Sequence, residues 1–248
     1  MKDFLTIVYF HLKLFAQNSY FRTIVFVTTI SYVMIQYVAA YAVHDLGNPN
    51  IWLRAGIIGT WAAGTSAAGV IPFQKYQGTL PYILDSRKGD AFSLSALIIP
   101  AACFGLLAFP ISFLTSFLLG INVVNGHFFA LLFGILGLWA SVILLDFVVA
   151  GTFVLTPNAM LYEGLLMAPI LIGSGIYQIP GQWGRTVQVF GWFLPMTTPV
   201  KLILHPTTVT GVDLLQFMII SIVWLVLAKS LLNYCMKKVR LVGEMGGL

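Results

Sequence analysis

The chain has 248 residues, of which 59% are hydrophobic and only 8% are charged, and its mean hydropathy is +0.92. Because a soluble domain carries about 25% charged residues, this composition excludes an ordinary water-soluble fold and predicts one all-α integral membrane domain across residues 1–248. The net charge of +5 does not indicate nucleic-acid binding, because the basic residues are scattered along the edges of apolar runs, where they orient a protein in the bilayer.

Residues 1–20 are predicted to form an interfacial amphipathic helix on the cytoplasmic leaflet. Polar residues recur at helical spacing at Asp3, Thr6, Lys13 and Gln17. The other face is apolar and consists of Phe4, Ile7, Val8, Leu12, Leu14 and Phe15. Such a pattern is typical of a helix that lies flat on a membrane. A signal peptide is the competing interpretation, but there is no small-residue cleavage site and Lys13 lies within the apolar core.

The rest of the chain has room for roughly six membrane-spanning helices of about 20 residues each. They are predicted at residues 23–43, 51–73, 93–119, 128–149, 159–179 and 212–234. Turn-forming clusters at 44–50 and 120–127 separate neighbouring spans. Pro100 and Pro110 should bend the third span. The second span is rich in small residues, which favours either tight helix packing or the lining of a central path, and the sequence leaves both open.

Residues 74–90 are the only long polar interruption in the first two thirds of the chain. Thr79 can cap a short helix whose first turn contains Pro81, and residues 82–84 give this helix an apolar face. The Arg-Lys-Gly sequence at 87–89 ends it. A short amphipathic helix held away from the membrane by two spans is suited to binding another protein.

A second polar interruption is predicted at residues 151–158, between the fourth and fifth spans. Asp146 and Glu163 flank it. Carboxylates in membrane-spanning segments are functional hypotheses by default, but both of these would lie near the cytoplasmic edge, where water reaches. The sequence leaves open whether they anchor the protein at the interface or act in its function.

Residues 180–210 alternate glycine and proline with aromatic residues, unlike the rest of the chain. The apolar run within this segment is too short to span a bilayer. We therefore predict a re-entrant or interfacial hairpin of short helices, with Trp183 and Trp192 at the level of the lipid headgroups.

The basic residues predict the orientation of the chain. Of the 13 lysines and arginines, all but Arg54, Arg185 and Lys201 fall on the side that holds both termini. This bias places both termini and residues 74–90 in the cytoplasm, and the aromatic hairpin outside.

Motifs for chemistry within the chain are missing from the sequence, so we expect a protein that is not an enzyme. It has no G-x-x-x-x-G-K-[ST] loop for ATP and no H-E-x-x-H or Cys/His cluster for a metal. Ser174 lies between glycines but has no partner base at a suitable spacing. Cys103 and Cys235 lie in apolar runs and are expected to be buried hydrophobes rather than a disulfide.

Two local patterns, together with this order of elements, resemble the permease subunit of the type-2 ABC transporter family, also called the type V exporters. The first is QKYQGTLPYIL at residues 74–84, which is similar to the family's cytoplasmic loop with Gly-Thr-Leu and a short helix. The second is GSGIYQIP at residues 173–180, continuing to Pro195, which is similar to the family's extracellular re-entrant segment. The family typically has glutamates where this sequence has Gln74, Gln77 and Pro81.

The resemblance implies that residues 74–90 form a coupling helix that a groove on the ATPase receives. The contact residues it implies are Gln74, Tyr76, Gln77, Gly78, Thr79, Leu80, Tyr82 and Leu84. A smaller second contact is expected at Asp146, Thr156, Asn158 and Glu163. Tyr82 and Leu84 have an alternative role, which is packing against the cytoplasmic ends of their own spans.

The resemblance also implies a half-transporter in the bacterial plasma membrane. Two permease subunits, identical or homologous, would pair with two cytoplasmic ATPase subunits, and these would bind the ATP and Mg²⁺. The second and fifth spans would line the path of an amphiphilic cargo, such as a drug, a hydrophobic peptide or a lipid-linked molecule, with membrane lipids as the other partner.

Two alternatives come from other classes of protein. The chain could be a non-transporting membrane module, such as an immunity or scaffolding protein that binds its target within the bilayer. A secondary transporter is less favoured, because neither charges along the spans nor an inverted internal repeat is evident.

Overall fold

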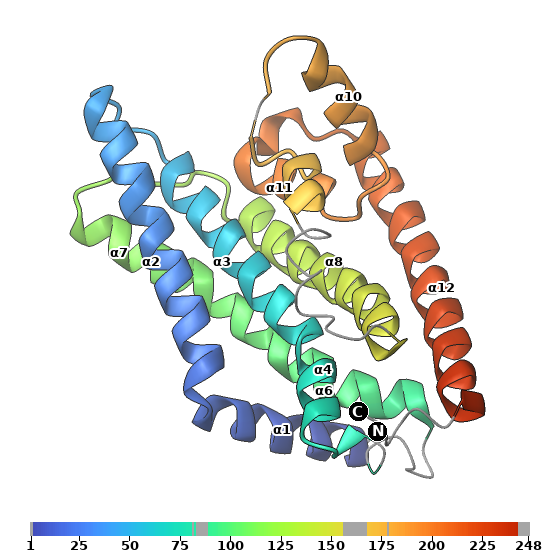
Figure 1. Cartoon of the computed structure of the whole chain (residues 1–248). Helices are drawn as coiled ribbons and strands as arrows, with labels where there is room; N and C mark the ends of the chain where they lie inside the picture. Colours follow the sequence, from blue (N-terminus) through green and yellow to red (C-terminus); the bar gives the residue numbers. More distant parts are fainter. Residues whose placement is uncertain (1, 81, 83–88, 156–167, 178, 243–248) are drawn as a thin grey trace.

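The computed structural model describes residues 2–80, 82, 89–155, 168–177 and 179–242. Every regular element in these ranges is a helix, which confirms the predicted helical fold class for this part of the chain (Figure 1). Four helices among the described residues are long and apolar enough to cross a membrane. They comprise Ser19–Ala42, Ala91–Leu118, Phe128–Phe153 and Gly211–Lys238. These four correspond to the predicted first, third, fourth and sixth spans.

The N-terminal helix α1 (Lys2–Gln17) lies across the foot of the bundle. Asn18 separates it from α2 (Ser19–Ala42), because the Asn18 side chain accepts a hydrogen bond from the Tyr20 amide at 3.0 Å and caps the new helix. Phe15 at the end of α1 is buried in the protein, whereas Leu14 on the predicted apolar face is exposed. The packed face of α1 contacts α6, where the rings of Phe4 and Phe92 lie 5.2 Å apart.

Helix α3 (Asn50–Ala68) is the central helix and packs against α2, α7 and α8. Its glycines permit this close packing, since a Cβ on Gly59 would lie 2.1 Å from Thr29 Oγ1 and one on Gly64 would lie 1.9 Å from Val142 Cγ1. The predicted second span is not one straight helix, because it breaks at Gly69 before α4 (Val70–Tyr76). Pro72 explains the break, since it has no amide hydrogen to donate to the carbonyl four residues earlier.

The predicted bend in the third span is present. Helix α6 (Asp90–Cys103) passes into the 3-10 turn η1 (Phe104–Leu107) and then into α7 (Ala108–Leu118). The tighter turn lies between the two prolines, which both lack a helical hydrogen-bond donor. Thr60 of α3 fixes the bend, since its hydroxyl donates to the Gly105 carbonyl at 2.9 Å.

Helix α8 (Phe128–Leu155) is longer than predicted, so residues 151–155 are helical rather than part of a polar interruption. Thr152 does not end the helix, because its hydroxyl donates to the Val149 carbonyl at 2.7 Å within the helix. Helix α12 (Gly211–Val242) also runs past the predicted end of the last span and packs mainly against α8.

The predicted fifth span ends earlier than expected. Its first residues lie outside the described part of the chain, and residues 168–173 are helical. The helix stops there, and Gly175 has a φ of 82°, in the left-handed region that favours glycine.

The predicted short helices after the fifth span are present as α10 (Gln182–Gly191), α11 (Thr197–Leu204) and the 3-10 turn η2 (Pro206–Thr208). They gather at one end of the bundle, opposite α1, α4 and the C-terminal end of α12 (Figure 1). Two distinct ends therefore exist, with residues 74–80 at one and the predicted hairpin at 180–210 at the other.

Candidate functional site

The predicted coupling segment begins with a tight turn after α4. Gly78 has a φ of 69°, and the Thr79 amide donates to the Gln74 carbonyl at 3.0 Å. The Thr79 hydroxyl donates to the same carbonyl at 3.1 Å and also hydrogen-bonds the Gln74 side chain. Gln74 and Thr79 therefore close the end of α4 by bonding each other.

The other predicted contact residues divide into exposed and buried. Tyr76 is 90% exposed and Tyr82 is 82% exposed, and Gln77 and Gly78 are also on the surface. Leu80 is only 3% exposed and belongs to a core cluster with residues of α6 and α12. Leu84 lies outside the described residues. A direct contact with a partner is thus open to the two tyrosines, whereas Leu80 fastens the segment to the body of the protein.

Asp146, which belongs to the predicted second cytoplasmic contact, has a buried side chain. It is 1% exposed, inside α8, where a Cβ on Gly64 of α3 would lie 3.5 Å from its carboxylate. Nine further residues of α8 follow it, and its position near the cytoplasmic edge of the membrane stays a prediction. The other three residues, Thr156, Asn158 and Glu163, lie outside the described part of the chain.

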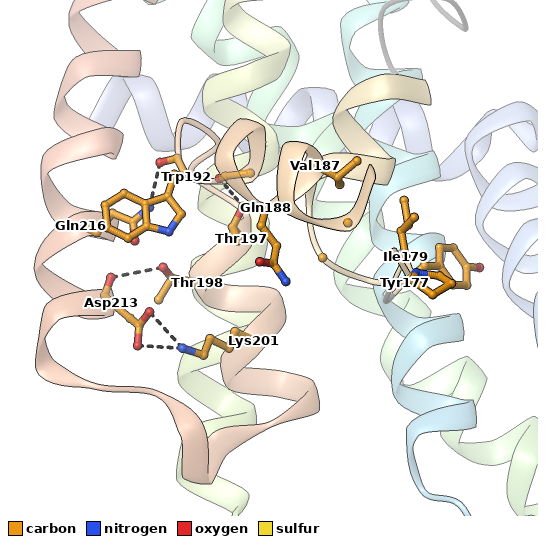
Figure 2. Close-up of a pocket in the computed structure, with 15 residues that line it drawn as sticks. Tyr177, Ile179, Val187, Gln188, Trp192, Thr197, Thr198, Lys201, Asp213 and Gln216 are labelled. Carbon is orange, nitrogen blue, oxygen red and sulfur yellow. Dashed lines mark hydrogen bonds and ion pairs between the residues drawn. The ribbon is translucent and has the colours of Figure 1, made fainter. Parts of the chain in front are cut away.

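A cavity of about 690 Å³ with both polar and apolar lining residues opens at the opposite end, among α10, α11, the start of α12 and the segment before α10 (Figure 2). A second cavity of about 390 Å³ adjoins it and shares the residues Gly175, Gln188, Thr197 and Lys201. The sequence predicts a hairpin of short helices here but not a cavity, because the walls meet only when the consecutive segments between Gly173 and Gln216 fold onto one another.

One ion pair sits in the wall of the cavity. Lys201 of α11 donates to both carboxylate oxygens of Asp213 on α12, at 3.0 and 2.9 Å. Asp213 also accepts from the Thr210 amide at 2.7 Å and from the Thr210 hydroxyl at 2.8 Å. Thr210 and Asp213 thus form a capping box at the start of α12, which was the sequence signal available for this part of the site.

Three further hydrogen bonds join the elements that line the cavity. Gln216 of α12 donates to the Trp192 carbonyl at 2.8 Å, and Trp224 donates to the Phe193 carbonyl at 2.8 Å. The Thr197 hydroxyl donates to the Gly191 carbonyl at 2.6 Å. Because α12 is bonded to the link between α10 and α11, these elements form one unit around the cavity.

Ser141 ties this unit to α8, since its hydroxyl donates to the Pro195 carbonyl at 3.0 Å. Tyr177 on the far wall hydrogen-bonds the hydroxyl of Tyr32 on α2. The cavity is therefore held from several sides by polar contacts between elements.

No group of three or more His, Cys, Asp or Glu side chains among the described residues could hold a metal ion. The two cysteines are free, with Cys235 buried and Cys103 partly buried.

The fold and its four long apolar helices define this chain as a multi-pass membrane protein. Comparison with protein-family models, with curated proteins and with solved structures finds no match to the chain.

Proposed function

We propose that this chain is the membrane-spanning permease subunit of an ATP-driven ABC exporter that is coupled to a separate cytoplasmic ATPase. The proposal rests on the resemblance of residues 74–84 and 173–195 to the family's two local patterns. It is consistent with a helical membrane domain in which these two regions lie at opposite ends. In this proposal α3 is the second span and the helix that ends at Gly173 is the fifth, which gives six spans.

The observation that supports this function best is the arrangement of residues 76–82. Two strongly exposed tyrosines, Tyr76 and Tyr82, flank Leu80, which is buried in the core. Exposed aromatic side chains on a segment that is fixed to its own protein are well suited to anchor an interface. A displacement of the tyrosines by a partner would move Leu80 and the helices packed around it.

The mechanism follows from this attachment. Two permease subunits, identical or homologous, assemble with two ATPase subunits that bind ATP and Mg²⁺. ATP closes the ATPase dimer, and the coupling segment transmits this rigid-body movement to the spans. Nucleotide shifts the balance between the inward-open and outward-open arrangements, which need to differ by only a few kcal/mol. The cargo is amphiphilic and follows a path lined by the second and fifth spans.

In this scheme both termini and residues 74–90 lie in the cytoplasm, and the α10–α11 end faces the outside of the bacterial plasma membrane. Labelling tests this orientation directly. In a background with Cys103→Ala and Cys235→Ala, a Tyr82→Cys variant should react with a membrane-impermeant thiol reagent only when the cytoplasmic side is open. Labelling of intact cells from outside would contradict the orientation.

Co-purification with the ATPase encoded in a neighbouring reading frame tests the function. We expect Tyr82→Ala and Tyr76→Ala to weaken assembly by about tenfold each, since buried interface aromatics contribute about 1–2 kcal/mol or more. Tyr9→Ala is the matched control, because Tyr9 is an exposed tyrosine at the same end, on α1.

Leu80 is a poor choice for this test, because its replacement would disturb the core. Equal assembly and equal cargo-stimulated ATP hydrolysis in all three tyrosine variants would contradict the assigned role of the segment. A chain that binds no P-loop ATPase would favour the non-transporting membrane module instead.

A further inference from the structure

The cavity at the α10–α11 end has a volume of about 690 Å³, within the range of sites that bind small molecules. Four of its wall positions are glycines, and at one of them, Gly175, a Cβ would meet nothing within 4 Å. The four glycines comprise Gly173, Gly175, Gly184 and Gly191. Exposed aromatic residues of the α10 region, among them Trp183 and Phe193, surround this end, and such residues are typical of membrane–water interfaces.

The charges of the described lining residues cancel. Lys201 and Asp213 form a two-pronged ion pair, and the Asp213 carboxylate also accepts two hydrogen bonds from Thr210. An anion would have to compete with Asp213 for Lys201, and a cation would have to displace Lys201 from Asp213. The cavity is therefore suited to an uncharged ligand.

The remaining hydrogen-bonding groups include both donors and acceptors. Gln216 donates through its amide nitrogen to Trp192, which leaves the amide oxygen as an acceptor. Thr197 uses its hydrogen on Gly191, which leaves its oxygen as an acceptor. Lys201 has a third N–H, and the Gln188 amide reaches into the space between this group and Tyr177 (Figure 2). Closely spaced donors and acceptors match hydroxyl groups, since each hydroxyl both donates and accepts.

The rim supplies an apolar surface beside these polar groups. The Trp192 side chain lines the cavity and is largely exposed, and Ile179 and Val187 line it as well. A flat aromatic ring next to amides and hydroxyls matches the two characters of a sugar ring, which has apolar C–H faces and polar edges.

We propose that this cavity binds a neutral, hydroxyl-rich group such as a sugar ring, either free or as the headgroup of a glycosylated lipid. Trp192 packs against the face of the ring, and Gln188, Gln216 and Lys201 bond its hydroxyls. The proposal stands apart from the ATPase coupling, so that binding can be measured on the isolated chain and can succeed or fail independently of the exporter function.

Binding is tested on the purified full chain in nanodiscs made without sugar detergents. The soluble probes are the methyl glycosides of glucose, galactose and N-acetylglucosamine, and the lipid probe is monoglucosyl diacylglycerol in the nanodisc. Phosphate and tetramethylammonium are the ionic comparisons. Four variants are measured, of which Gln188→Ala and Trp192→Leu alter the cavity. Gln182→Ala and Trp183→Leu are their matched controls, because Gln182 and Trp183 are exposed on α10 and do not line the cavity.

We expect at least one glycoside to saturate the chain and to bind more tightly than either ion. Gln188→Ala and Trp192→Leu should each raise its Kd by about fivefold, as the loss of one ligand contact does, while the two controls leave it unchanged. Saturation by a methyl glycoside identifies a free sugar as sufficient, and binding of the glucosyl lipid alone identifies the lipid headgroup.

Three results would overturn the proposal. They are the absence of binding for every glycoside and for the lipid, binding of either ion at least as tight as that of the glycosides, and equal effects of the cavity variants and their controls. Equal thermal stability of the four variants ensures that loss of binding is not loss of folding.

Discussion

The packing around Gly59 leads to a direct prediction about the helical core. Gly59 lies on α3 and faces α2 and α7 at once, and a Cβ there would lie 2.1 Å from Thr29 Oγ1 and 2.6 Å from Ala108 Cβ. The Ala108 Cβ is fixed to its backbone, and rotation of the Thr29 hydroxyl would still leave the Thr29 Cβ 3.2 Å from the new methyl group. Gly59→Ala should therefore force α3 away from its neighbours.

The size of the effect follows from two opposing terms. Overpacking a well-packed core costs about 1–3 kcal/mol, whereas replacing glycine with alanine inside a helix stabilises it by about 0.5–1 kcal/mol. We expect the free energy of unfolding to fall by about 1–2 kcal/mol as the balance of these terms. The measurement is thermal unfolding of the purified chain in detergent, supported by a reversible denaturant titration.

Two further variants make the Gly59 test specific. Gly47→Ala is the control, because a Cβ on Gly47 would meet nothing within 4 Å. The double variant Gly59→Ala/Ala108→Gly should recover part of the lost stability, since it removes one of the two clashing atoms. If Gly59→Ala were as stable as the parent, or if the double variant gained nothing, then α2, α3 and α7 would not meet in this way.

Other predictions follow from particular contacts. Gly151→Ala in α8 should raise the free energy of unfolding by about 0.5–1 kcal/mol in the same assay, because its Cβ would make ordinary contacts at 3.5 Å with Leu231 and Leu232 of α12. A lower stability would contradict this packing. Burial lowers the pKa of His11, so the unfolded chain binds the proton more readily than the folded chain does. The free energy of unfolding should therefore fall as the pH drops below about 6.5. Melting curves measured at a series of pH values should show this fall for the parent chain but not for His11→Phe. Asp213→Asn should lower the unfolding free energy by about 1–2 kcal/mol through the loss of the Lys201 pair and the helix cap, whereas Asp45→Asn at an exposed turn should change it little. Equal melting temperatures for these two variants would contradict the role of Asp213.

The sequence predicts well those features that depend on nearby residues. The apolar runs locate the four long helices, the turn clusters at 44–50 and 120–127 mark their ends, and Pro100 and Pro110 predict the bend between α6 and α7. These signals are local, because a run of apolar residues, a turn-forming cluster or a missing amide hydrogen determines the structure of its own segment.

Features that depend on the partner of a side chain could not be predicted. The Gly-Thr pair at the end of the fourth span resembles a turn, but Thr152 bonds within the helix and α8 continues. The family resemblance places Leu80 among the expected contact residues for the ATPase, but its side chain packs into the core of its own protein. The wall of the cavity joins Gln216 to the Trp192 carbonyl, and such a pairing has no signature in hydropathy.

Helix α12 connects the two polar ends of the protein. Leu232 and Met236, near its foot, belong to the same core cluster as Leu80 of the coupling segment. Its first turns carry Asp213 and Gln216, which form the polar wall of the cavity. A helix of 32 residues at 1.5 Å per residue is about 48 Å long, and this one packs mainly against α8. Under the two proposals above, a displacement of Leu80 would reach the cavity through this one continuous helix, so a partner at one end and a ligand at the other would bias the same element.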